Sequence, residues 1–400
     1  MLAVLQIILL ALSGFFCLYL AALSVLALAS RRRAASRASP LRRFAVVVPA
    51  HNEEVSLGRT LHNLLALDYP RSCFDVIVIA DNCDDRTADV ARESGANVEV
   101  RTDASQRGKG YALRWCFDRL FAAQPAYDAI VVIDADSEAS GNFLTVMNYY
   151  LARGARVIQA SDIVASRAGA WSSEMTRVGF TLYNHVRPLG RSVIGCSAGL
   201  RGNGMCFSAG VLREFPWSSF SVSEDLEYAL ELALTGVKVQ FAPQATVLAT
   251  MPANAQNALS QRARWEAGRV PFLRKYTAPL LKAVLRRKSF WILDTLVDLW
   301  TPALVNLVAF VAALTAVTLV LALLGAEDMG VFVLLWCGVA ALALVHLFVG
   351  LLAAGADSAM YQALLHVPRY AVWKALLYAK ILRTKRTDEW VRTTRESPSA

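Results

Sequence analysis

Three long apolar runs constrain the fold of this chain more than any other feature. They cover residues 2–29, 299–325 and 331–356, contain no Asp, Glu, Lys or Arg, and include a single histidine, His346. A helix needs about 20 predominantly apolar residues to cross the hydrocarbon core of a bilayer. We therefore predict transmembrane helices at residues 1–30, 299–325 and 331–356, with a long polar region between the first and the second.

The composition agrees with a membrane protein. Hydrophobic residues make up 56% of the 400 residues and charged residues 18%, whereas charged residues are about 25% of soluble domains. The first run is too long for a cleaved signal peptide, and its basic residues follow it. By the positive-inside rule these arginines place the next segment in the cytoplasm of a multi-pass protein of the cell (inner or plasma) membrane. They are Arg31, Arg32, Arg33, Arg37, Arg42 and Arg43.

The formal net charge of +9 does not indicate nucleic-acid binding, because the basic residues cluster beside the apolar runs, as in residues 274–288. Attraction to anionic membrane lipid explains them. We expect an interfacial segment at residues 276–298, and an interfacial helix with a cytoplasmic tail at residues 357–400. The seven cysteines show no CxxC pair and no metal-ligand spacing, which fits a reduced compartment.

The polar region, residues 41–275, predicts one α/β domain. Short Val- and Ile-rich segments that are apolar on both faces alternate with helical patterns. This alternation is typical of a Rossmann-like sheet with right-handed crossovers and with ligands at the carboxyl ends of the strands. The predicted strands are residues 44–49, 75–80 and 129–133, and the predicted helices are residues 55–67, 86–94 and 109–122.

Acidic side chains follow these strands: Glu53 the first, Asp81 the second, and Asp134 and Asp136 the third. Asn and Asp at such positions also serve as turn residues and helix caps. However, two carboxylates that leave a buried strand in close succession repel each other unless a cation or hydrogen-bond donors share them. Mg²⁺ or Mn²⁺, held by one or two carboxylates and by substrate phosphates, meets that need. We therefore predict a divalent metal site at Asp134 and Asp136.

Two further motifs precede or begin predicted helices. Lys109 stands between Gly108 and Gly110, where the glycines allow a backbone to approach a phosphate closely and the lysine adds positive charge. The string Ser223-Glu224-Asp225 precedes a helical pattern, so that it also fits an ordinary capped helix N-terminus. Both interpretations of this string can hold together.

The motif Gln261-x-x-Arg264-Trp265 lies before the second apolar run. Positions i, i+3 and i+4 share one face of a helix, so Arg264 can meet a diphosphate while Trp265 offers a flat surface to a sugar ring. The alternative is an amphipathic helix at the membrane surface, where Arg and Trp are frequent.

In this order, the motifs of residues 44–265 resemble the family 2 glycosyltransferases, in particular the membrane branch of the cellulose, hyaluronan and poly-N-acetylglucosamine synthases. The resemblance implies a GT-A-like mixed α/β domain in the cytoplasm, with transmembrane helices at both ends. It also implies an inverting, metal-dependent hexosyltransferase that takes a nucleotide sugar, usually a UDP-sugar, and Mg²⁺ or Mn²⁺.

The resemblance assigns a role to each motif. In the family, the aspartate of the Ser/Thr-Glu-Asp motif is the general base, so Asp225 and the adjacent Glu224 are the expected catalytic residues. The acceptor would lie against Asn203, Gly204 and Trp265, and the metal against Asp134 and Asp136. The residues expected to bind the nucleotide sugar are Ala50, Glu53, Asp81, Lys109, Asp134, Gln261 and Arg264.

Several functions remain open at this stage. The Gln-x-x-Arg-Trp motif favours a saccharide acceptor in exopolysaccharide or cell-envelope glycan synthesis, together with partner proteins of that pathway. Three spanning runs instead favour the addition of one or a few sugars to a lipid-linked acceptor. A nucleotidyltransferase and a membrane receptor for nucleotide sugars are the other classes considered. The segment 388–395, which contains Trp390, is similar to a gating segment of the synthases and also fits a polar terminus.

Overall fold

The computed structural model describes residues 2–30, 40–122, 126–166, 171–249, 255–367 and 369–370, and for residues 171–172 and 255–269 it describes the backbone alone. The expected gating segment with Trp390 lies outside the described residues, as do the side chains of Gln261, Arg264 and Trp265. Contacts divide the described chain into two units, one built around the predicted sheet and one around the apolar helices.

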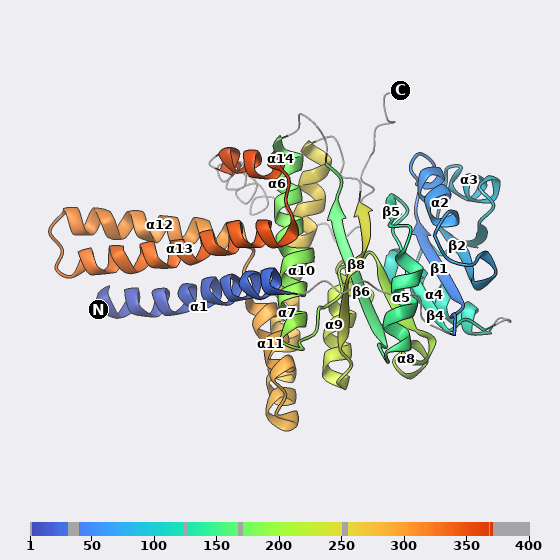
Figure 1. The fold of residues 1–400 in the computed structure, drawn as a ribbon, viewed down its shortest axis with the longest axis horizontal. Helices are drawn as coiled ribbons and strands as arrows, with labels where there is room; N and C mark the ends of the chain where they lie inside the picture. Colours follow the sequence, from blue (N-terminus) through green and yellow to red (C-terminus); the bar gives the residue numbers. More distant parts are fainter. Residues whose placement is uncertain are drawn as a thin grey trace. The chain divides into compact units, whose positions relative to one another are not determined.

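The first unit contains one mixed sheet (Figure 1). Within the described ranges it has eight strands. Their order across the sheet is β3-β2-β1-β4-β7-β6-β8-β5. The strands are β1 (Phe44–Ala50), β2 (Phe74–Asp81), β3 (Asn97–Arg101), β4 (Ala129–Val132), β5 (Ser137–Ala139), β6 (Val157–Val164), β7 (Met205–Ser208) and β8 (Val239–Ala249).

The strand directions bring the carboxyl ends of β1, β2 and β4 to one edge of the sheet. β1 pairs in parallel with β2 and with β4, and β2 pairs in parallel with β3. β7 runs antiparallel to both β4 and β6. The predicted mixed α/β fold is thereby confirmed, and β1, β2 and β4 agree with the predicted strands to within one residue at each end.

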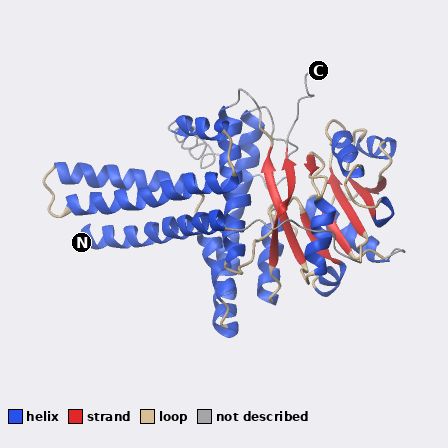
Figure 2. Cartoon of the chain, in the orientation of Figure 1, coloured by secondary structure: helices blue, strands red, loops and turns tan. Residues whose placement is uncertain are grey.

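Helices flank this sheet (Figure 2). The helix predicted at residues 109–122 is present with the same bounds, and the other two predicted helices are shorter at both ends. The core between helices and strands is apolar and includes Phe44, Val46, Leu57 and Phe143, all with side chains excluded from solvent. The helices of this unit are α2 (Leu57–Leu65), α3 (Thr87–Glu93), α4 (Lys109–Ala122), α5 (Phe143–Ala152), α8 (Ala209–Glu214), α9 (Glu224–Thr235) and α10 (Ala255–Arg287), with a 3₁₀ turn, η1 (Arg71–Cys73).

The second unit contains the apolar runs. Within the described residues, three helices are long and apolar enough to cross a membrane: α1 (Leu2–Ala29), α12 (Leu304–Leu323) and α13 (Met329–Ala354). Figure 1 shows them side by side, with α13 packed against both α1 and α12. Gln6 ties them together, since its Nε2 donates to Thr318 Oγ1 over 3.0 Å and its Oε1 accepts from Trp336 Nε1 over 2.7 Å.

A segment between β6 and β7 also belongs to this second unit. It comprises α6 (Trp171–Phe180), a π-helical turn η2 (Thr181–Val186) and α7 (Arg187–Val193). The backbone of Gly190 packs directly on Leu23 of α1, where a Cβ would lie 2.2 Å from the carbonyl oxygen. Within the predicted domain of residues 41–275, residues 166–195 therefore group with the membrane-length helices and not with the sheet.

Buried ion pairs connect α7, at the end of this segment, to α11 (Phe290–Trp300). The guanidinium groups of Arg187 and Arg191 lie 2.7 and 3.0 Å from the carboxylate of Asp298. Asp298 belongs to α11, and the chain then continues through α12 and α13 to α14 (Ser358–Ala363) and a 3₁₀ turn, η3 (Leu364–His366). Because both arginines are buried, removing Asp298 would leave uncompensated charge, which is the costly way to break such a cluster.

Candidate active site

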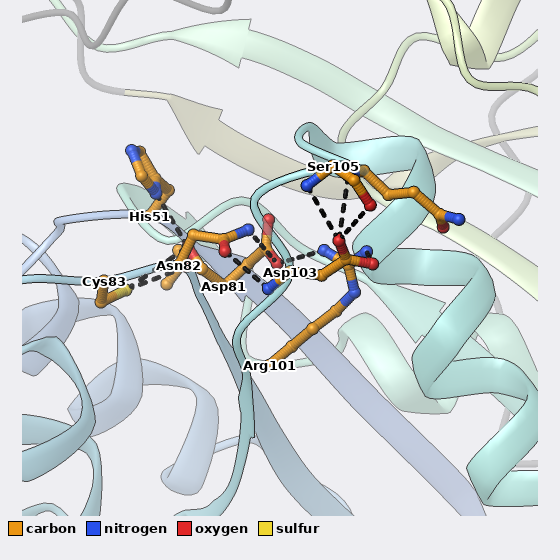
Figure 3. Close-up of polar contacts among 9 residues, drawn as sticks. His51, Asp81, Asn82, Cys83, Arg101, Asp103 and Ser105 are labelled. Atoms are coloured by element: carbon orange, nitrogen blue, oxygen red, sulfur yellow. Dashed lines mark hydrogen bonds and ion pairs between the residues drawn. The ribbon is translucent and has the colours of Figure 1, made fainter.

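The loop after β2 is organised around a buried ion pair. Arg101 Nη1 donates to Asp81 Oδ1 over 2.6 Å, and both side chains are about 5% exposed (Figure 3). Asn82 Nδ2 donates to the same oxygen over 3.0 Å. Asp81 therefore lies at the carboxyl end of β2 as predicted, with one of its carboxylate oxygens already engaged by neighbouring side chains.

Two asparagines with left-handed backbones shape the ends of β1 and β2. Asn52 and Asn82 have φ angles of 57° and 51°, a region in which Asn is several-fold enriched over other non-glycine residues. Asn82 Oδ1 accepts from the backbone N–H of Asp103 over 2.8 Å, and Asn52 Oδ1 accepts from that of Asp84 over 2.9 Å. His51 Nδ1 lies 2.8 Å from the carbonyl oxygen of Asp81 (Figure 3). These bonds link the loops that follow β1, β2 and β3.

Two further residues expected at the nucleotide, Ala50 and Glu53, lie at the end of β1 and in the loop that follows it. Ala50 is buried, and its carbonyl oxygen lies 3.5 Å from Cys83 Sγ. Glu53 Oε2 accepts from Ser56 Oγ over 2.6 Å, and its backbone N–H donates to Thr87 Oγ1 over 2.8 Å. Both therefore face the loop after β2, at the same edge of the sheet as Asp81.

Lys109 links the turn after β4 to the glycine-rich strand entry before β7. Its Nζ lies 2.5 Å from Asp134 Oδ1 and 2.6 Å from the carbonyl oxygen of Gly202. Asp136, two residues beyond Asp134, accepts from Ser137 Oγ over 3.2 Å. The ammonium thus supplies a cationic partner for Asp134.

The acidic motif of α9 reaches the same point. Glu224 and Asp225 occupy the first turn of this helix. Glu224 Oε1 lies 3.8 Å from Lys109 Nζ, and Asp225 Oδ2 would lie 3.4 Å from a Cβ placed on Gly202. Ser223 precedes the helix, and its side chain makes no capping hydrogen bond. Lys109 and Asp225, which are 116 positions apart in the sequence, therefore lie in one cluster of charged side chains.

The charges of this cluster shift its protonation equilibria. Burial raises the pKa of Glu224 to about 7, against the opposing effect of Lys109. Burial also raises the pKa of Asp225, while a hydrogen bond from the backbone N–H of Leu226 and the charge of Lys109 oppose the shift. For Lys109, burial disfavours the charged form, but Asp134 and Glu224 outweigh it and the pKa lies above its ordinary value. The lysine therefore remains charged while Glu224 titrates near neutrality.

Asn203 and Gly204 lie beside these carboxylates, but Asn203 is only 3% exposed. Its amide oxygen accepts from the backbone N–H of Asp134 over 3.1 Å, and its Nδ2 donates to Ser137 Oγ over 3.0 Å. Its side chain is thus directed at the turn after β4.

Sequence patterns missed four residues of this site. Arg101 pairs with Asp81, and Gln159 and Asp162 lie on β6 behind the turn after β4. The positive charge of Arg201 lowers the pKa of Asp225 against the effect of burial. A polar side chain inside an otherwise apolar strand pattern, as at Gln159 and Asp162, was the available signal.

The Gln-x-x-Arg-Trp motif lies on the helix α10, whose backbone is continuous through residues 255–287. The predicted helical spacing is therefore present, while the side chains of the motif lie outside the described part of the chain. Further along α10, Lys275 Nζ lies 2.6 Å from Glu227 Oε1, and Tyr276 donates to Glu231 over 3.2 Å. These contacts join α10 to α9, the helix that begins with Glu224.

The chemistry of Asp134 and Asp136 fits a divalent cation. Both side chains are partly exposed, and carboxylate oxygens are the ligands that Mg²⁺ and Mn²⁺ prefer. Among the described residues, no group of three or more His, Cys, Asp or Glu side chains is arranged to hold a metal ion. Mg²⁺ sites commonly bind through one or two protein carboxylates, with substrate phosphates as further ligands.

This mixed sheet, with acidic side chains at the carboxyl ends of its strands, defines a GT-A fold. Residues 40–268 match the family model described as "Glycosyltransferase like family 2", and the chain belongs to this family.

The curated relatives are distant and longer than the matched region. The chain is 25% identical over 259 residues to "Probable glycosyltransferase YdaM" of Bacillus subtilis, a match that covers 62% of this chain and 60% of that protein. It is 27% identical over 238 residues to "Beta-monoglucosyldiacylglycerol synthase" of Synechocystis, covering 57% of this chain and 48% of the relative. The matched region of this chain thus spans about half of the length of each relative.

A solved structure resembles more of the chain. A mannosyltransferase from Pyrobaculum calidifontis, in complex with GDP-Man and Mn²⁺, superposes with a TM-score of 0.55 and 19% sequence identity. The similarity covers 86% of this chain and 98% of the mannosyltransferase. At this identity the likeness establishes the fold.

Proposed function

We propose that this chain is an inverting glycosyltransferase of the cytoplasmic face of the cell membrane, which moves a sugar from a nucleotide sugar onto a hydroxyl group of a lipid or lipid-linked acceptor. One observation carries the proposal. Asp134 and Glu224 share the ammonium of Lys109, and Asp225 and that ammonium both lie against Gly202. Family membership supplies the reaction class, and this cluster supplies the charges that the reaction needs.

The donor would lie along the strand ends. In the proposed complex the nucleoside contacts the loops of Ala50, Glu53 and Asp81, while the diphosphate faces the turn of Asp134 and Asp136. A bound divalent cation would neutralise charge on the diphosphate. Lys109 is within reach of the same turn, so its ammonium can pass from Asp134 to the leaving group as negative charge develops there.

The acceptor hydroxyl would be activated by Asp225. In a single displacement, the acceptor oxygen forms a bond to the anomeric carbon as the bond from that carbon to the diphosphate breaks. The nucleoside diphosphate leaves with the electron pair, and the carboxylate of Asp225 takes the hydroxyl proton. One attack on one face inverts the anomeric centre. Glu224, which shares Lys109 with Asp134, would keep the local charge balanced.

Two observations favour an acceptor in the membrane. Several relatives carry names that contain a lipid, including the monoglucosyldiacylglycerol synthase above and "4,4'-diaponeurosporenoate glycosyltransferase" of Staphylococcus aureus, which is 36% identical over 94 residues, 23% of each chain. The chain also has three helices of membrane-spanning length in its described part. Positive charge beside these runs supports a cytoplasmic catalytic region.

A saccharide acceptor in glycan synthesis is the second candidate. The Gln261, Arg264 and Trp265 motif on α10 favours it, because a Trp ring can stack on a sugar while Arg meets a phosphate. In either case the donor site would be the same, and only the acceptor differs.

The test uses the full chain in lipid nanodiscs with Mn²⁺, a panel of UDP- and GDP-sugars, and extracted membrane lipids. We expect one donor to release nucleoside diphosphate and its labelled sugar to enter the organic phase, with both signals lost in Asp225→Asn. Asp118→Asn, an exposed carboxylate on α4, is the matched control. Label that enters only water-soluble product would favour the saccharide acceptor, and absence of release from every donor with every acceptor would contradict the proposal.

A further inference from the structure

Asn203 is the side chain that joins the turn after β4 to the strand β6. Its Oδ1 accepts from the backbone N–H of Asp134 over 3.1 Å, and its Nδ2 donates to Ser137 Oγ over 3.0 Å. The same nitrogen lies 3.4 Å from Asp162 Oδ1, at the limit of hydrogen-bond distance. A single amide therefore accepts from the start of the Asp134–Ser137 turn and donates to its end.

Gln159 fixes the backbone on either side of Asn203. Its Nε2 donates to the carbonyl oxygen of Asn203 over 2.7 Å, and its Oε1 accepts from the backbone N–H of Arg201 over 2.9 Å. Gln159 is fully buried, so these bonds form in a low-dielectric interior where an unpaired polar group is costly. The position of Asn203 is therefore set by β6.

Gly202 and Gly204, on either side of Asn203, hold residues 202–204 in place through close packing and backbone hydrogen bonds. Gly204 has a φ of +68°, and a Cβ there would lie 2.8 Å from the side chain of Val247 and 3.1 Å from that of Ala160. Its backbone N–H donates to Val132 and its carbonyl oxygen accepts from Ala160. Gly202, with a φ of +80°, presents its carbonyl oxygen to Lys109. The segment is thus bonded to β4, β6 and α4 at once.

We propose that Asn203 is a positioning residue, which holds the Asp134–Ser137 turn at a fixed place relative to Asp225 and does not contact the acceptor. The carboxylate of Asp225 lies against Gly202, the residue before Asn203, whereas the amide of Asn203 holds Asp134. Asn203 thereby couples the carboxylates expected to face the donor to the carboxylate expected to face the acceptor. This inference rests on the proposed function for its binding and kinetic parts, whereas its hydrogen-exchange part rests on the structure alone.

Asn suits this position because it accepts and donates at the same time. An Asp side chain at position 203 could accept from the backbone of Asp134, but when ionised it could not donate to Ser137. It would also add a carboxylate beside Asp162, whose pKa burial already raises well above its ordinary value, with the charges of Asp134 and Asp136 adding to the shift. An Ala side chain would remove both bonds and leave the backbone N–H of Asp134 without its acceptor.

The test compares Asn203→Ala with wild type in three measurements on the full chain. Calorimetric titration with UDP or GDP in the presence of Mn²⁺ should show Kd increased about tenfold or more, the effect expected when a partner of a metal-binding carboxylate is lost. The KM for the acceptor should not change. Hydrogen exchange of the peptide that contains Asp134 should be faster in the ligand-free variant. Asn97→Ala, an exposed asparagine at the start of β3, is the control for all three.

The outcomes separate this inference from the proposed function. An unchanged Kd for UDP and GDP together with a raised acceptor KM would overturn it and return Asn203 to the acceptor site. If the wild-type chain binds neither nucleotide, the proposed function fails, and unchanged hydrogen exchange at Asp134 would overturn the positioning role independently. Should Asn203→Ala fail to fold, Ser137→Ala removes the hydroxyl that accepts from Asn203 and also donates to Asp136. Its readout is therefore hydrogen exchange at Asp134, which should be faster because Asn203 is held less firmly, and unchanged exchange would overturn the positioning role.

Discussion

Lys109 Nζ lies 2.5 Å from Asp134 Oδ1 and also 3.8 Å from Glu224 Oε1. The lysine begins α4, whereas Asp134 follows β4 and Glu224 begins α9. One ammonium therefore balances the charge of two parts of the site that would otherwise repel each other. The consequences of losing it can be measured directly.

Replacement of Lys109 by Met should reduce turnover by about a hundredfold or more, because a preorganised charge that stabilises a leaving group typically contributes that much. The pKa of Glu224 should rise further, since Lys109 at present lowers it. Lys282→Met, at an exposed position on α10, is the matched control. Steady-state release of nucleoside diphosphate measures the effect, and a rate close to that of wild type would remove Lys109 from the proposed site.

Activity should fall as the pH decreases through about 7. Burial raises the pKa of Glu224 to about 7 and also raises that of Asp225, so the two adjacent carboxyl groups share a proton as the pH falls, and Asp225 in its protonated form can no longer accept one from the acceptor. Glu224→Gln should move this acidic limb to lower pH, because Asp225 then ionises without a negative neighbour. A pH profile of kcat/KM for both proteins tests the assignment, which an unshifted limb would contradict.

The same shift should affect stability in the opposite direction. Between the ordinary pKa of Glu224, 4.5, and its raised value of about 7, the folded state holds a proton that the unfolded state has released. Stability therefore falls as the pH rises through this window, while activity rises. Thermal unfolding should show a melting temperature that falls as the pH rises through this range in wild type and falls less in Glu224→Gln.

The strands that are apolar on both faces could be predicted from the sequence. β1, β2 and β4 carry Val and Ile on both faces, so an uninterrupted apolar pattern marks them. β3 was not predicted, because its sequence, Asn-Val-Glu-Val-Arg, contains no apolar run. All of its side chains except that of Arg101 are at least partly exposed. The segment α6–η2–α7 could not be assigned to the membrane-length helices, because close packing at Gly190 depends on tertiary contacts that no local pattern encodes.

The candidate site was predictable as a set of strand-end acids, and its connections were not. Asp81, Asp134 and Asp225 lie at or beside the ends of regular elements, which sequence motifs locate well. Arg101 pairs with Asp81 across the β2–β3 crossover, and Gln159 reaches Asn203 between strands that are adjacent only in the folded sheet. Such partners are chosen by topology, so a single sequence does not identify them.

Removal of the guanidinium of Arg101 should destabilise the chain. Arg101→Met leaves Asp81 as a buried carboxylate without its ionic partner, and breaking a buried pair from one side costs about 3–5 kcal/mol. The double variant Asp81→Asn, Arg101→Met should recover part of this loss. Urea unfolding followed by tryptophan fluorescence measures the free energy of unfolding of each variant. Arg119→Met, which breaks the exposed ion pair of Arg119 with Glu99, is the control. Equal effects of Arg101→Met and Arg119→Met would show that burial of the pair does not matter.

Gly110→Ala should impair both stability and turnover, because α4 and the loop before α9 meet at this glycine. A Cβ on Gly110 would lie 2.3 Å from the carbonyl oxygen of Ser219 and 3.2 Å from the Cα of Phe220, and neither backbone atom can rotate away as a side chain could. Relief requires α4 to move, which shifts Lys109 relative to Glu224 and weakens the shared charge contact.

Gly210→Ala separates this steric effect from the general effect of alanine in a helix. Gly210 lies in α8 with no atom within 4 Å of a Cβ built on it, so its replacement should stabilise by about 0.4–1 kcal/mol through the unfolded state. Melting temperature and nucleoside diphosphate release are measured on both variants. If Gly110→Ala behaved like Gly210→Ala in both measurements, the contact between α4 and the loop before Glu224 would not determine the position of Lys109.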